Sequence, residues 1–562
     1  MSILERISRD HTLGQLFEER VAATPDAVAY IEYSHVLGKW FKHSWESVHQ
    51  QAGRAQSLLR GLGLEPGDRI GIMAHGGTYW VTLDLAAAGL GIVTVPLYHR
   101  DRGGNVAYVA ERSRLRALFI GGPAQWQELE GERARMSGVE HIFSAVAVPD
   151  TEIRPFLLEL SSTASSPYRV AQNDPDSTAT IVFTSGTTGR PKGVQLTHAN
   201  ILSNAIAATA AVPIGPEDRL LSFLPLSHMF ERTVGYYSPM LRGSTVAFVR
   251  SVATLREDLR LQPPTVLVSV PRVYEKIYRA LTSRRPLNSP VGRLLVSLSR
   301  KAGRAGPFSL WRILGLLPRR LIGQKVSQGL GGHLRIAITG GAAMNPRVAD
   351  FFSGIGLKVL QGYGLTETSP VVSVNREEDI RRRSVGPPLE GVEVRLSEDQ
   401  ELLVRGRGVM QGYLNDPEAT QAAIDSEGWF HTGDLARIEE DHIYIVGRAK
   451  EIIVLSNGEK VPPEDLEGAL CNDPRISQAW VAGDGRPFLS AVVVVEEPAD
   501  EGQLLDSIDS LLHDFPGYAR IKRLHVETEP WSEQNGFLTA TLKLRRRALH
   551  EKYDEVISTF YG

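Results

Sequence analysis

The stretch that decides the fold reads Thr184-Ser185-Gly186-Thr187-Thr188-Gly189-Arg190-Pro191-Lys192-Gly193. It follows an apolar, β-branched run at residues 179–183, which predicts a buried strand ending in a turn rich in hydroxyls and glycines. Glycines let backbone N–H groups approach phosphate oxygens closely, and Lys192 adds a compact positive charge. The stretch lacks the GK[ST] ending of the Walker loop. It therefore predicts a polyphosphate-binding turn of another kind, with a flexible surface loop as the alternative.

Composition and length indicate a soluble globular protein with several folding units. Apolar residues make up 42% of the 562 residues and charged residues 23%. Single cores stop growing near roughly 250 to 300 residues, so more than one unit is expected. The formal net charge of −3 gives no global attraction to nucleic acid, and no nucleic-acid partner is predicted.

The single cysteine and the N-terminal sequence indicate the cellular compartment. Cys471 alone excludes an internal disulfide and a multi-cysteine zinc site. Glu5 and Asp10 fall where a secretory signal needs an apolar core, and no uncharged apolar run approaches about 18 residues. We therefore expect a cytoplasmic protein without a spanning helix, and peripheral contact at the inner membrane surface stays open.

Hydrophobic periodicity predicts α/β architecture in the first two thirds of the chain. Residues 12–24 have helical spacing and end before Pro25. Residues 69–73, 78–90 and 92–96 predict a β-α-β unit, which implies a parallel sheet. A second strand-helix series is expected to open at residue 179 and to continue through strands near 220, 245–248 and 265–270. Two doubly wound halves follow from this pattern.

The last third of the chain changes character twice. Short strands at 392–396, 401–404 and 442–446 favour a small β barrel. Beyond Arg448, a strand at 452–455, a helix at 463–470 and paired strands at 478–482 and 488–495 precede a helical tail. The predicted fold is α/β, with two doubly wound subdomains and a β barrel in a large domain at 1–448. A smaller, mobile α+β domain is predicted at 449–562.

The opening stretch resembles the signature loop of the AMP-forming adenylate enzymes, which include acyl-CoA synthetases, luciferases and the adenylation domains of peptide synthetases. Further family motifs follow in the family's order, from about Leu13 to the end of the chain. The resemblance implies that this loop binds the phosphates of ATP and that Thr184 also takes part in catalysis. The loop residues concerned are Thr184, Ser185, Gly186, Thr187, Thr188, Gly189 and Lys192.

A second motif follows the apolar strand at 357–360 and contains Gln361, Gly362, Tyr363, Gly364, Thr366 and Glu367. In the family, the residue matching Tyr363 stacks on adenine, Thr366 lies near the phosphate and Glu367 holds Mg²⁺. A hard cation between carboxylate and phosphate oxygens neutralises charge that builds during attack at phosphorus. A solvated glutamate in a turn is the alternative.

Two further motifs resemble the family's nucleoside contacts. The turn Gly340-Gly341-Ala342 resembles the adenine-contacting turn, although Ala343 replaces the proline commonly found next and a packing glycine pair is the alternative. Asp434 and Arg448 match the residues that bind both ribose hydroxyls. A carboxylate suits that task because its two oxygens accept from two O–H donors.

The C-terminal motifs imply a change of domain orientation between two reaction steps. Lys450 matches the family's hinge. Gly458 matches a turn that approaches the pantetheine arm of CoA, where a residue without a side chain permits close approach. Lys543 matches the catalytic lysine, which would lower the barrier when two anions meet. Among arginines 545–547, a solvated charged face is the alternative for Lys543.

Residues 224–232 (LPLSHMFER) and 271–278 (PRVYEKIY) resemble segments of long-chain fatty acyl-CoA ligases. There the residue matching His228 lies beside the carboxylate and acyl tunnel. The implied function is ATP- and Mg²⁺-dependent activation of a long-chain fatty acid to an acyl-adenylate, followed by transfer to CoA. Transfer to a carrier protein, activation of an aryl or other acid, and luciferase-like oxygenation are the alternatives. A non-catalytic binding relative would be expected to lack Lys543, Glu367 or Asp434, and all three are present.

Residues 284–325 are a local anomaly, with ten Lys or Arg residues and no acidic residue. Leu310, Leu314, Leu317 and Leu321 keep near-helical spacing, and Pro318 is expected to break or kink that run. A basic and apolar segment is typical of contact with an anionic membrane. The alternative is an ordinary helix pair whose apolar face packs on the domain.

Overall fold

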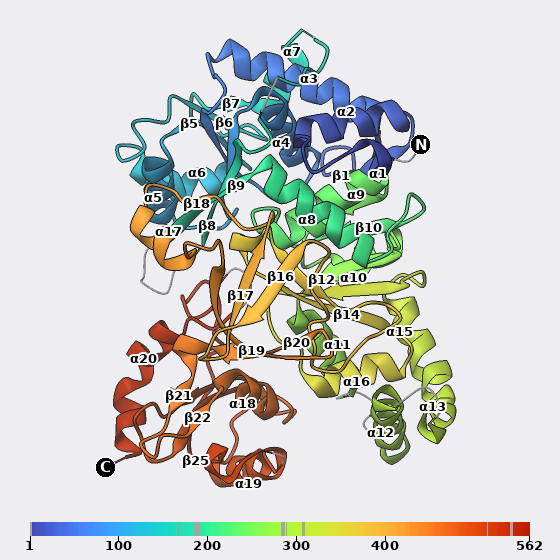
Figure 1. Ribbon diagram of the computed structural model, residues 1–562. Coiled ribbons are helices and arrows are strands. Elements are labelled where there is room, and N and C mark those ends of the chain that lie inside the picture. The colour runs from blue at the N-terminus through green and yellow to red at the C-terminus, as the bar shows by residue number, and fades with distance from the viewer. Residues whose placement is uncertain are drawn as a thin grey trace.

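The computed structural model describes residues 3–164, 166–171, 174–184, 191–282, 287, 289–305, 309–513, 515–539 and 543–561. Figure 1 shows a large N-terminal domain above a smaller C-terminal domain. No helix in the described ranges is both long and apolar enough to cross a membrane. The predicted α/β fold with two domains of unequal size is confirmed, while the residue at which they divide stays a prediction.

The first large sheet contains the predicted β-α-β unit. Strands β3 (Arg69–Met73) and β4 (Val93–Pro96) pair in parallel and are connected by helix α4 (Thr78–Leu90). The sheet order in the described chain is β18-β9-β8-β4-β3-β5-β6-β7. Its other strands are β18 (Gly412–Tyr413), β9 (Lys192–Thr197), β8 (Thr178–Thr184), β5 (Leu115–Ile120), β6 (His141–Ser144) and β7 (Arg154–Pro155). Helix α2 (Leu13–Ala23) confirms the helix predicted at 12–24, and Thr12 caps it in a capping box with Gln15.

The second large sheet has the order β15-β14-β13-β12-β10-β11-β1-β2. Its strands are β15 (Val371–Val374), β14 (Lys358–Gly364), β13 (Ile336–Thr339), β12 (Val266–Ser269), β10 (Arg219–Ser222), β11 (Thr245–Phe248), β1 (Val28–Ser34) and β2 (Lys39–Ser44). The predicted opening of this half at residue 179 was wrong. Strand β8 instead pairs with β4 in the first sheet, with Thr180 opposite Thr94, and the N-terminal β1 joins the second sheet beside β11.

Four antiparallel strands form the predicted small barrel-like unit, in the order β16-β17-β19-β20. They are β16 (Val392–Leu396), β17 (Glu401–Gly406), β19 (Phe430–Glu439) and β20 (His442–Arg448). Strand β20 leads through the turn η5 (Ala449–Glu451) into the C-terminal domain.

The C-terminal domain has its own core, built on β23 (Ile476–Ala482) and β24 (Leu489–Val495), which pair antiparallel as predicted. Helix α18 (Pro463–Leu470) has the predicted bounds, and α19 (Glu501–Leu511) and α20 (Arg546–Thr559) complete the helices. A parallel edge strand, β25 (Ile521–Glu527), replaces part of the expected helical tail. The predicted strand at 452–455 is shorter, as β21 (Ile453–Val454) pairs with β22 (Lys460–Val461).

Candidate active site

A cavity of about 2850 Å³ lies where the ends of β8 and β14, the barrel strands and the C-terminal domain meet. The residues around it come from segments far apart in the chain. Predicted site residues in its wall are Thr184, Lys192, His228, Gly341, Ala342, Gln361, Gly362, Tyr363, Gly364, Thr366, Glu367, Asp434, Arg448 and Lys543. The structure therefore gathers most of the described candidates around one space.

The phosphate-loop candidates enter the cavity from two paired strands. Thr184 ends β8, Lys192 begins β9, and the two residues are opposite each other in the antiparallel register. The Nζ atom of Lys192 lies 4.9 Å from the centre of the Tyr413 ring. Ser185, Gly186, Thr187, Thr188 and Gly189 lie outside the described residues.

Tyr413 also contacts the predicted metal ligand. Its hydroxyl donates a hydrogen bond of 3.0 Å to Oε1 of Glu367, which lies in the turn η4 (Thr366–Thr368). Burial, together with the Glu367 charge, raises the pKa of Tyr413. The tyrosine is therefore protonated at neutral pH and remains a donor to the carboxylate.

The proposed ribose site is preorganised by two contacts to one carboxylate. Tyr363 donates a 2.5 Å hydrogen bond to Oδ2 of Asp434, and Nε of Arg448 lies 3.0 Å from Oδ1. Asp434 and Arg448 are register partners on β19 and β20. Burial raises the pKa of Asp434, and the Arg448 charge opposes that rise. Strand pairing thus fixes the arginine and carboxylate side by side.

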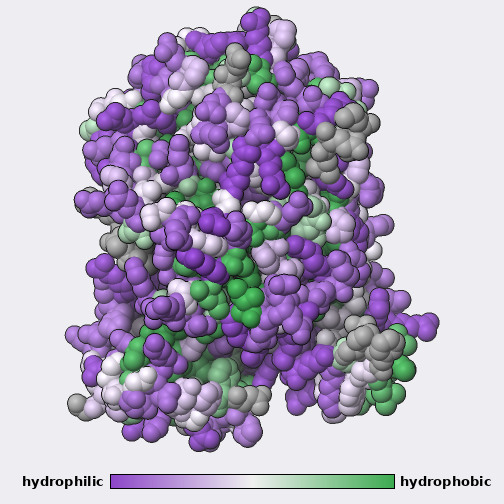
Figure 2. All heavy atoms as spheres, in the orientation of Figure 1, coloured by the Kyte–Doolittle hydropathy of each residue, from purple (hydrophilic) through white to green (hydrophobic). Residues whose placement is uncertain are grey.

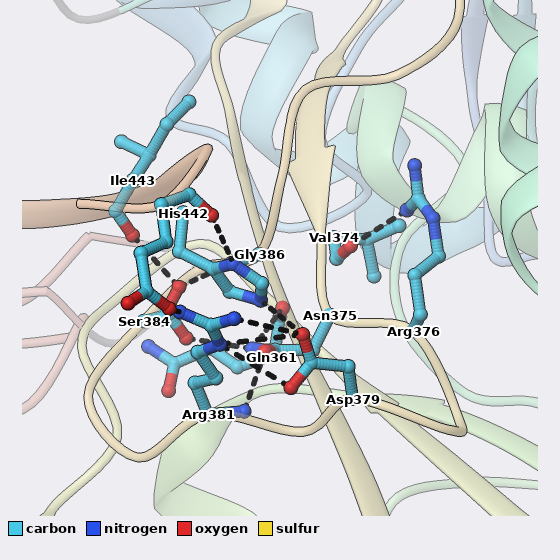
Figure 3. Close-up of polar contacts among 11 residues, drawn as sticks. Gln361, Val374, Asn375, Arg376, Asp379, Arg381, Ser384, Gly386, His442 and Ile443 are labelled. Atoms are coloured by element: carbon cyan, nitrogen blue, oxygen red, sulfur yellow. Dashed lines mark hydrogen bonds and ion pairs between the residues drawn. The ribbon is translucent and has the colours of Figure 1, made fainter. Parts of the chain in front are cut away.

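Hydrogen bonds between β14 and the barrel fix the two parts of the proposed nucleoside site relative to each other (Figure 3). Asn375, which is buried, donates from its backbone and side chain to the carbonyl of Gln361 at 3.0 and 3.2 Å, and from its side chain to the carbonyl of Ser384 at 2.6 Å. The Ser384 hydroxyl donates to the carbonyl of Ile443 on β20 at 3.0 Å. One chain of hydrogen bonds therefore connects the end of β14 to the strand that carries Arg448.

Glycines at the end of β14 allow close backbone approach. A Cβ atom on Gly364 would lie 1.9 Å from the carbonyl oxygen of Pro370, and one on Gly362 would lie 3.0 Å from that of Ser373. Gly341 has a φ of +84°, which favours glycine. A Cβ on Gly340 would lie 3.2 Å from the ring of Phe230, and the contact of this glycine with adenine stays a prediction.

His228 precedes a buried, wide-turned helix, η2 (Glu231–Tyr237). Burial, with the positive charge of Lys543, lowers the pKa of His228 to about 4, so the imidazole is neutral at pH 7. Its Nε2 atom is buried and has no hydrogen-bond partner among the described residues. A buried polar atom without a partner in the wall of a cavity suits a substrate oxygen.

Arg232 anchors the η2 helix in the core. Its guanidinium forms an ion pair with Asp84 and donates at 2.7 Å to both Thr94 and Thr180. Asp84 lies on α4, and the two threonines are on neighbouring strands of the first sheet. Because His228 and Arg232 are one helical turn apart, this network fixes the segment that carries the histidine.

Lys543 lines the cavity from the C-terminal domain. The Thr539 N–H donates to the Lys543 carbonyl at 2.8 Å, and the Lys543 N–H donates to the Thr539 hydroxyl at 3.0 Å. The side chain is accessible from the cavity, although protein surrounds it. Desolvation, helped by the Arg448 charge, lowers the pKa of Lys543, and Glu464, Asp434 and Glu451 oppose that shift.

Contacts between the domains hold the C-terminal domain against the large domain. Tyr98 donates to Glu533 at 3.1 Å, and Asn345 donates to the carbonyl of Gly468 at 2.9 Å. The lysine therefore faces the nucleoside candidates in this orientation. Gly458 lies in the β21–β22 turn with a φ of +84° and does not line the cavity, whereas Lys450 does. The roles of Lys450 and Gly458 stay predictions.

The surroundings of Glu367 fit the proposed Mg²⁺. No group of three or more His, Cys, Asp or Glu residues in the described part of the chain could form a metal cage. Mg²⁺ usually binds through one or two carboxylates together with substrate phosphates and water. Glu367, whose partner Tyr413 lies beside Lys192, supplies such a carboxylate, so a magnesium ion bound with the nucleotide fits this donor set.

Sequence reasoning missed Tyr413 and Arg546. Tyr413 lies 46 positions from the glutamate it contacts, and nothing in its local sequence indicates that contact. Arg546 joins Glu451, next to the predicted hinge, at 2.7 Å and Glu467 at 2.7 and 2.8 Å. In the sequence it is one of three consecutive arginines, and only the fold distinguishes it from Arg547.

Family models cover almost the whole chain. A model described as AMP-binding enzyme matches residues 17–414, and one described as AMP-binding enzyme C-terminal domain matches residues 450–562. The chain belongs to the AMP-binding enzyme family. The resemblance drawn from the motifs is thereby confirmed.

This AMP-binding enzyme has full-length relatives with a shared description. The long-chain-fatty-acid–CoA ligase FadD15 of Mycobacterium tuberculosis is 33% identical, covering 98% of this chain and 97% of that protein. The human long-chain-fatty-acid–CoA ligase 6 is 29% identical over 92% of this chain and 83% of its own.

Solved structures share the fold at lower identity. An anthranilate CoA ligase, AuaEII, bound to anthranoyl-AMP has a TM-score of 0.81 at 19% identity, covering 99% of both chains. The adenylation domain of a carboxylic acid reductase from Segniliparus rugosus, bound to AMP, has a TM-score of 0.80 at 22% identity, covering 100% of this chain and 95% of its own. The two-domain architecture is therefore that of known adenylate-forming structures.

Proposed function

We propose that this AMP-binding enzyme is a long-chain fatty acid–CoA ligase. The fatty carboxylate would attack the α-phosphorus of ATP to give acyl-adenylate and pyrophosphate, and the CoA thiol would then displace AMP to give the thioester. The observation that carries this proposal is one cavity that gathers the nucleotide candidates, His228 and Lys543 and whose wall also includes residues of helices α11 (Pro271–Thr282) and α12 (Pro290–Arg304). The names of the full-length relatives support the same acid class.

The polar part suits a nucleotide and a carboxylate. Lys192 and Lys543 supply positive charge, while Asp434 offers two acceptor oxygens held by Tyr363 and Arg448. When bound, Mg²⁺ on Glu367 would neutralise phosphate charge. Neutral His228 would donate a hydrogen bond to the substrate carboxylate without adding another charge.

Apolar side chains in one part of the wall suit an acyl chain. In helices α11 and α12 and between them, Val273, Tyr278, Leu287 and Val296 contribute to the wall, together with charged residues such as Arg272, Arg293 and Arg300. A hydrocarbon chain packed on the apolar residues would gain about 0.8 kcal/mol for each buried methylene.

Catalysis would depend on where Lys543 is in each step. In adenylation, two anions must meet at phosphorus, and a lysine fixed near that point stabilises the developing charge. The place of Lys543 in the cavity wall, near Asp434 and Arg448, supports this role. A rotation at Lys450 would then withdraw it and turn the Gly458 side toward the site for CoA.

The test is ATP–pyrophosphate exchange with a panel of fatty, aryl and amino acids of graded length, followed by thioester formation with CoA or with a carrier protein. We expect exchange with long-chain fatty acids and release of AMP only when CoA is added. Exchange with aryl or amino acids alone, or transfer only to the carrier protein, would contradict the proposal.

A further inference from the structure

Helix α12 is held on the domain by small residues and leaves the following segment outside. A Cβ atom on Gly303 would lie 1.9 Å from the carbonyl oxygen of Asp350, and one on Gly354 would lie 1.8 Å from that of Ser299. Both Asp350 and Gly354 belong to α16 (Pro346–Gly354), so the two helices cross with their backbones in contact. The short helices α13 (Leu310–Leu314) and α14 (Leu316–Pro318) then lie at the edge of the molecule (Figure 1).

The apolar side chains of this segment face solvent rather than the core. Of the twenty large apolar side chains exposed in the described chain, nine fall between residues 291 and 321. Figure 2 shows hydrophobic side chains at the lower right, where Figure 1 draws α12 and α13. These nine define the α12–α14 patch: Val291, Leu294, Leu310, Trp311, Ile313, Leu314, Leu316, Leu317 and Leu321. These nine side chains therefore do not form an apolar face packed on the domain, which was the alternative for this segment.

Positive charge surrounds the patch. Exposed basic side chains in the same segment are Arg293, Lys301, Arg319, Arg320 and Lys325, whereas Arg304 forms an ion pair with Asp350 of α16. The segment contains no acidic residue, and Nζ of Lys301 lies 4.4 Å from the Trp311 ring. Exposed leucine and tryptophan bordered by lysine and arginine match the chemistry of an anionic lipid surface, which is apolar below negatively charged headgroups.

A second copy of the chain would fit this surface less well. In a two-fold dimer the same patch faces itself, so the basic residues of both copies would be brought together. Like charges without intervening acids disfavour that contact. Charge complementarity therefore favours a lipid surface as the partner.

The patch adjoins the part of the cavity that is lined by helix α12. Helix α12 contributes Arg293, Val296, Ser297 and Arg300 to the cavity wall, while Val291 and Leu294 of its first turns belong to the patch. The same helix thus separates the proposed acyl site from the exposed apolar surface.

We propose that the α12–α14 patch docks the protein peripherally on an anionic membrane, so that the acid passes from lipid into the cavity beside α12. The docking stands on the patch alone, and the delivery of acid rests on the proposed function. Insertion is shallow, because α13 and α14 are too short to cross a bilayer.

The experiment is co-sedimentation of the full chain, without substrates, with vesicles of phosphatidylcholine or of phosphatidylcholine mixed with phosphatidylglycerol. We expect binding to the anionic vesicles at low salt and weaker binding at about 1 M salt, where charges are screened beyond about 3 Å. Two variants address the patch, Trp311→Ser/Leu314→Ser/Leu317→Ser and Arg319→Glu/Arg320→Glu. Each should lower the partition coefficient at least about tenfold, because each removes two or three of the basic or apolar side chains that would contact the anionic surface.

Two control variants test whether any loss of vesicle binding is specific to the α12–α14 patch. Val36→Ser/Leu37→Ser removes exposed apolar side chains elsewhere, and Lys522→Glu/Arg523→Glu reverses two exposed charges elsewhere. Both should bind vesicles as the unaltered protein does, and all four variants should keep pyrophosphate exchange with a short, water-soluble acid. Absence of binding to anionic vesicles at low salt, or unchanged binding of both patch variants, overturns the docking. A patch variant that dissociates a dimer of the unaltered protein without affecting vesicle binding also overturns it. Vesicle binding without activation of any acid would instead refute the proposed function.

Discussion

The hydroxyl of Tyr413 donates a 3.0 Å hydrogen bond to Oε1 of Glu367. Tyr413 belongs to β18 at the edge of the first sheet, whereas Glu367 follows β14 of the second sheet. The contact therefore orients the predicted metal ligand across the boundary between the two α/β subdomains. Residues that orient a metal ligand are usually worth 10- to 100-fold in metal affinity, by the magnitudes typical of such partners.

Loss of this hydrogen bond should weaken the use of Mg²⁺. We expect Tyr413→Phe to raise the Mg²⁺ concentration for half-maximal adenylation by about tenfold or more. Glu367→Ala should nearly abolish adenylation at any Mg²⁺ concentration while the protein stays folded. Tyr444→Phe, on the barrel, is the matched control. Wild-type Mg²⁺ dependence in both Tyr413→Phe and Glu367→Ala would remove this pair from the metal site.

Arg546 should position Lys543, because it follows the lysine closely in the chain and donates hydrogen bonds to Glu451 and Glu467. Hydrogen bonds to charged groups contribute roughly 1.5 to 3 kcal/mol, so Arg546→Ala should slow adenylation by at least about tenfold. Arg547→Ala removes the neighbouring arginine, whose side chain is 79% exposed, and should have little effect. Equal rates for the two variants in single-turnover adenylation would show that the Arg546 contacts do not position the lysine.

The lowered pKa of Lys543 sets the direction of a pH effect. If adenylation needs the charged lysine, its rate should fall as pH rises through a pKa below the ordinary 10.5. The negative charge of Glu464 raises the pKa of Lys543. In Glu464→Gln the alkaline limb of the pH–rate profile, where the rate falls as pH rises, should therefore move to lower pH. The control Glu501→Gln, on α19, should leave it in place. A limb that stays fixed, or moves to higher pH, in Glu464→Gln would contradict the assignment of the titration to Lys543.

Loss of one partner of the ion pair between Arg232 and Asp84 should destabilise the large domain strongly, since both side chains are at most 3% exposed. Removing one partner of a buried pair leaves an uncompensated charge, so Asp84→Ala should lower the free energy of unfolding by about 3 to 5 kcal/mol. Glu132→Ala breaks an exposed pair with Arg135 and should cost about 0 to 1 kcal/mol. Urea unfolding followed by tryptophan fluorescence compares the two. Equal destabilisation would mean that the buried pair has no special role.

Local pattern predicted much of the fold. The helices at 78–90 and 463–470 and the strand at 69–73 have the expected bounds, because hydrophobic period and flanking turn residues agree there. Long-range pairing could not be predicted in the same way. β8 joins the first sheet and β1 the second because of contacts between segments far apart in the chain, which leave no local trace.

The candidate site shows the same division. Motif residues such as Tyr363, Asp434 and Arg448 meet in space, since strand ends and the β19–β20 register bring them together. Tyr413 and Arg546 act through partners 46 to 95 positions away and were therefore missed. The composition of residues 284–325 indicated an unusual segment. That many of its leucines face outward is seen only in the fold, where α12 crosses α16 closely and the leucines remain exposed.

We propose that Lys543 serves adenylation and is withdrawn before CoA reacts. Both half-reactions can be compared in Lys543→Ala, with thioester formation started from pre-made acyl-adenylate. Adenylation should slow by at least about a hundredfold, a loss of roughly 2.7 kcal/mol, as for other preorganised electrostatic donors. Thioester formation should stay near the wild-type rate. Equal loss in both half-reactions would contradict the claim, because it would make the lysine structural or leave it in the site throughout.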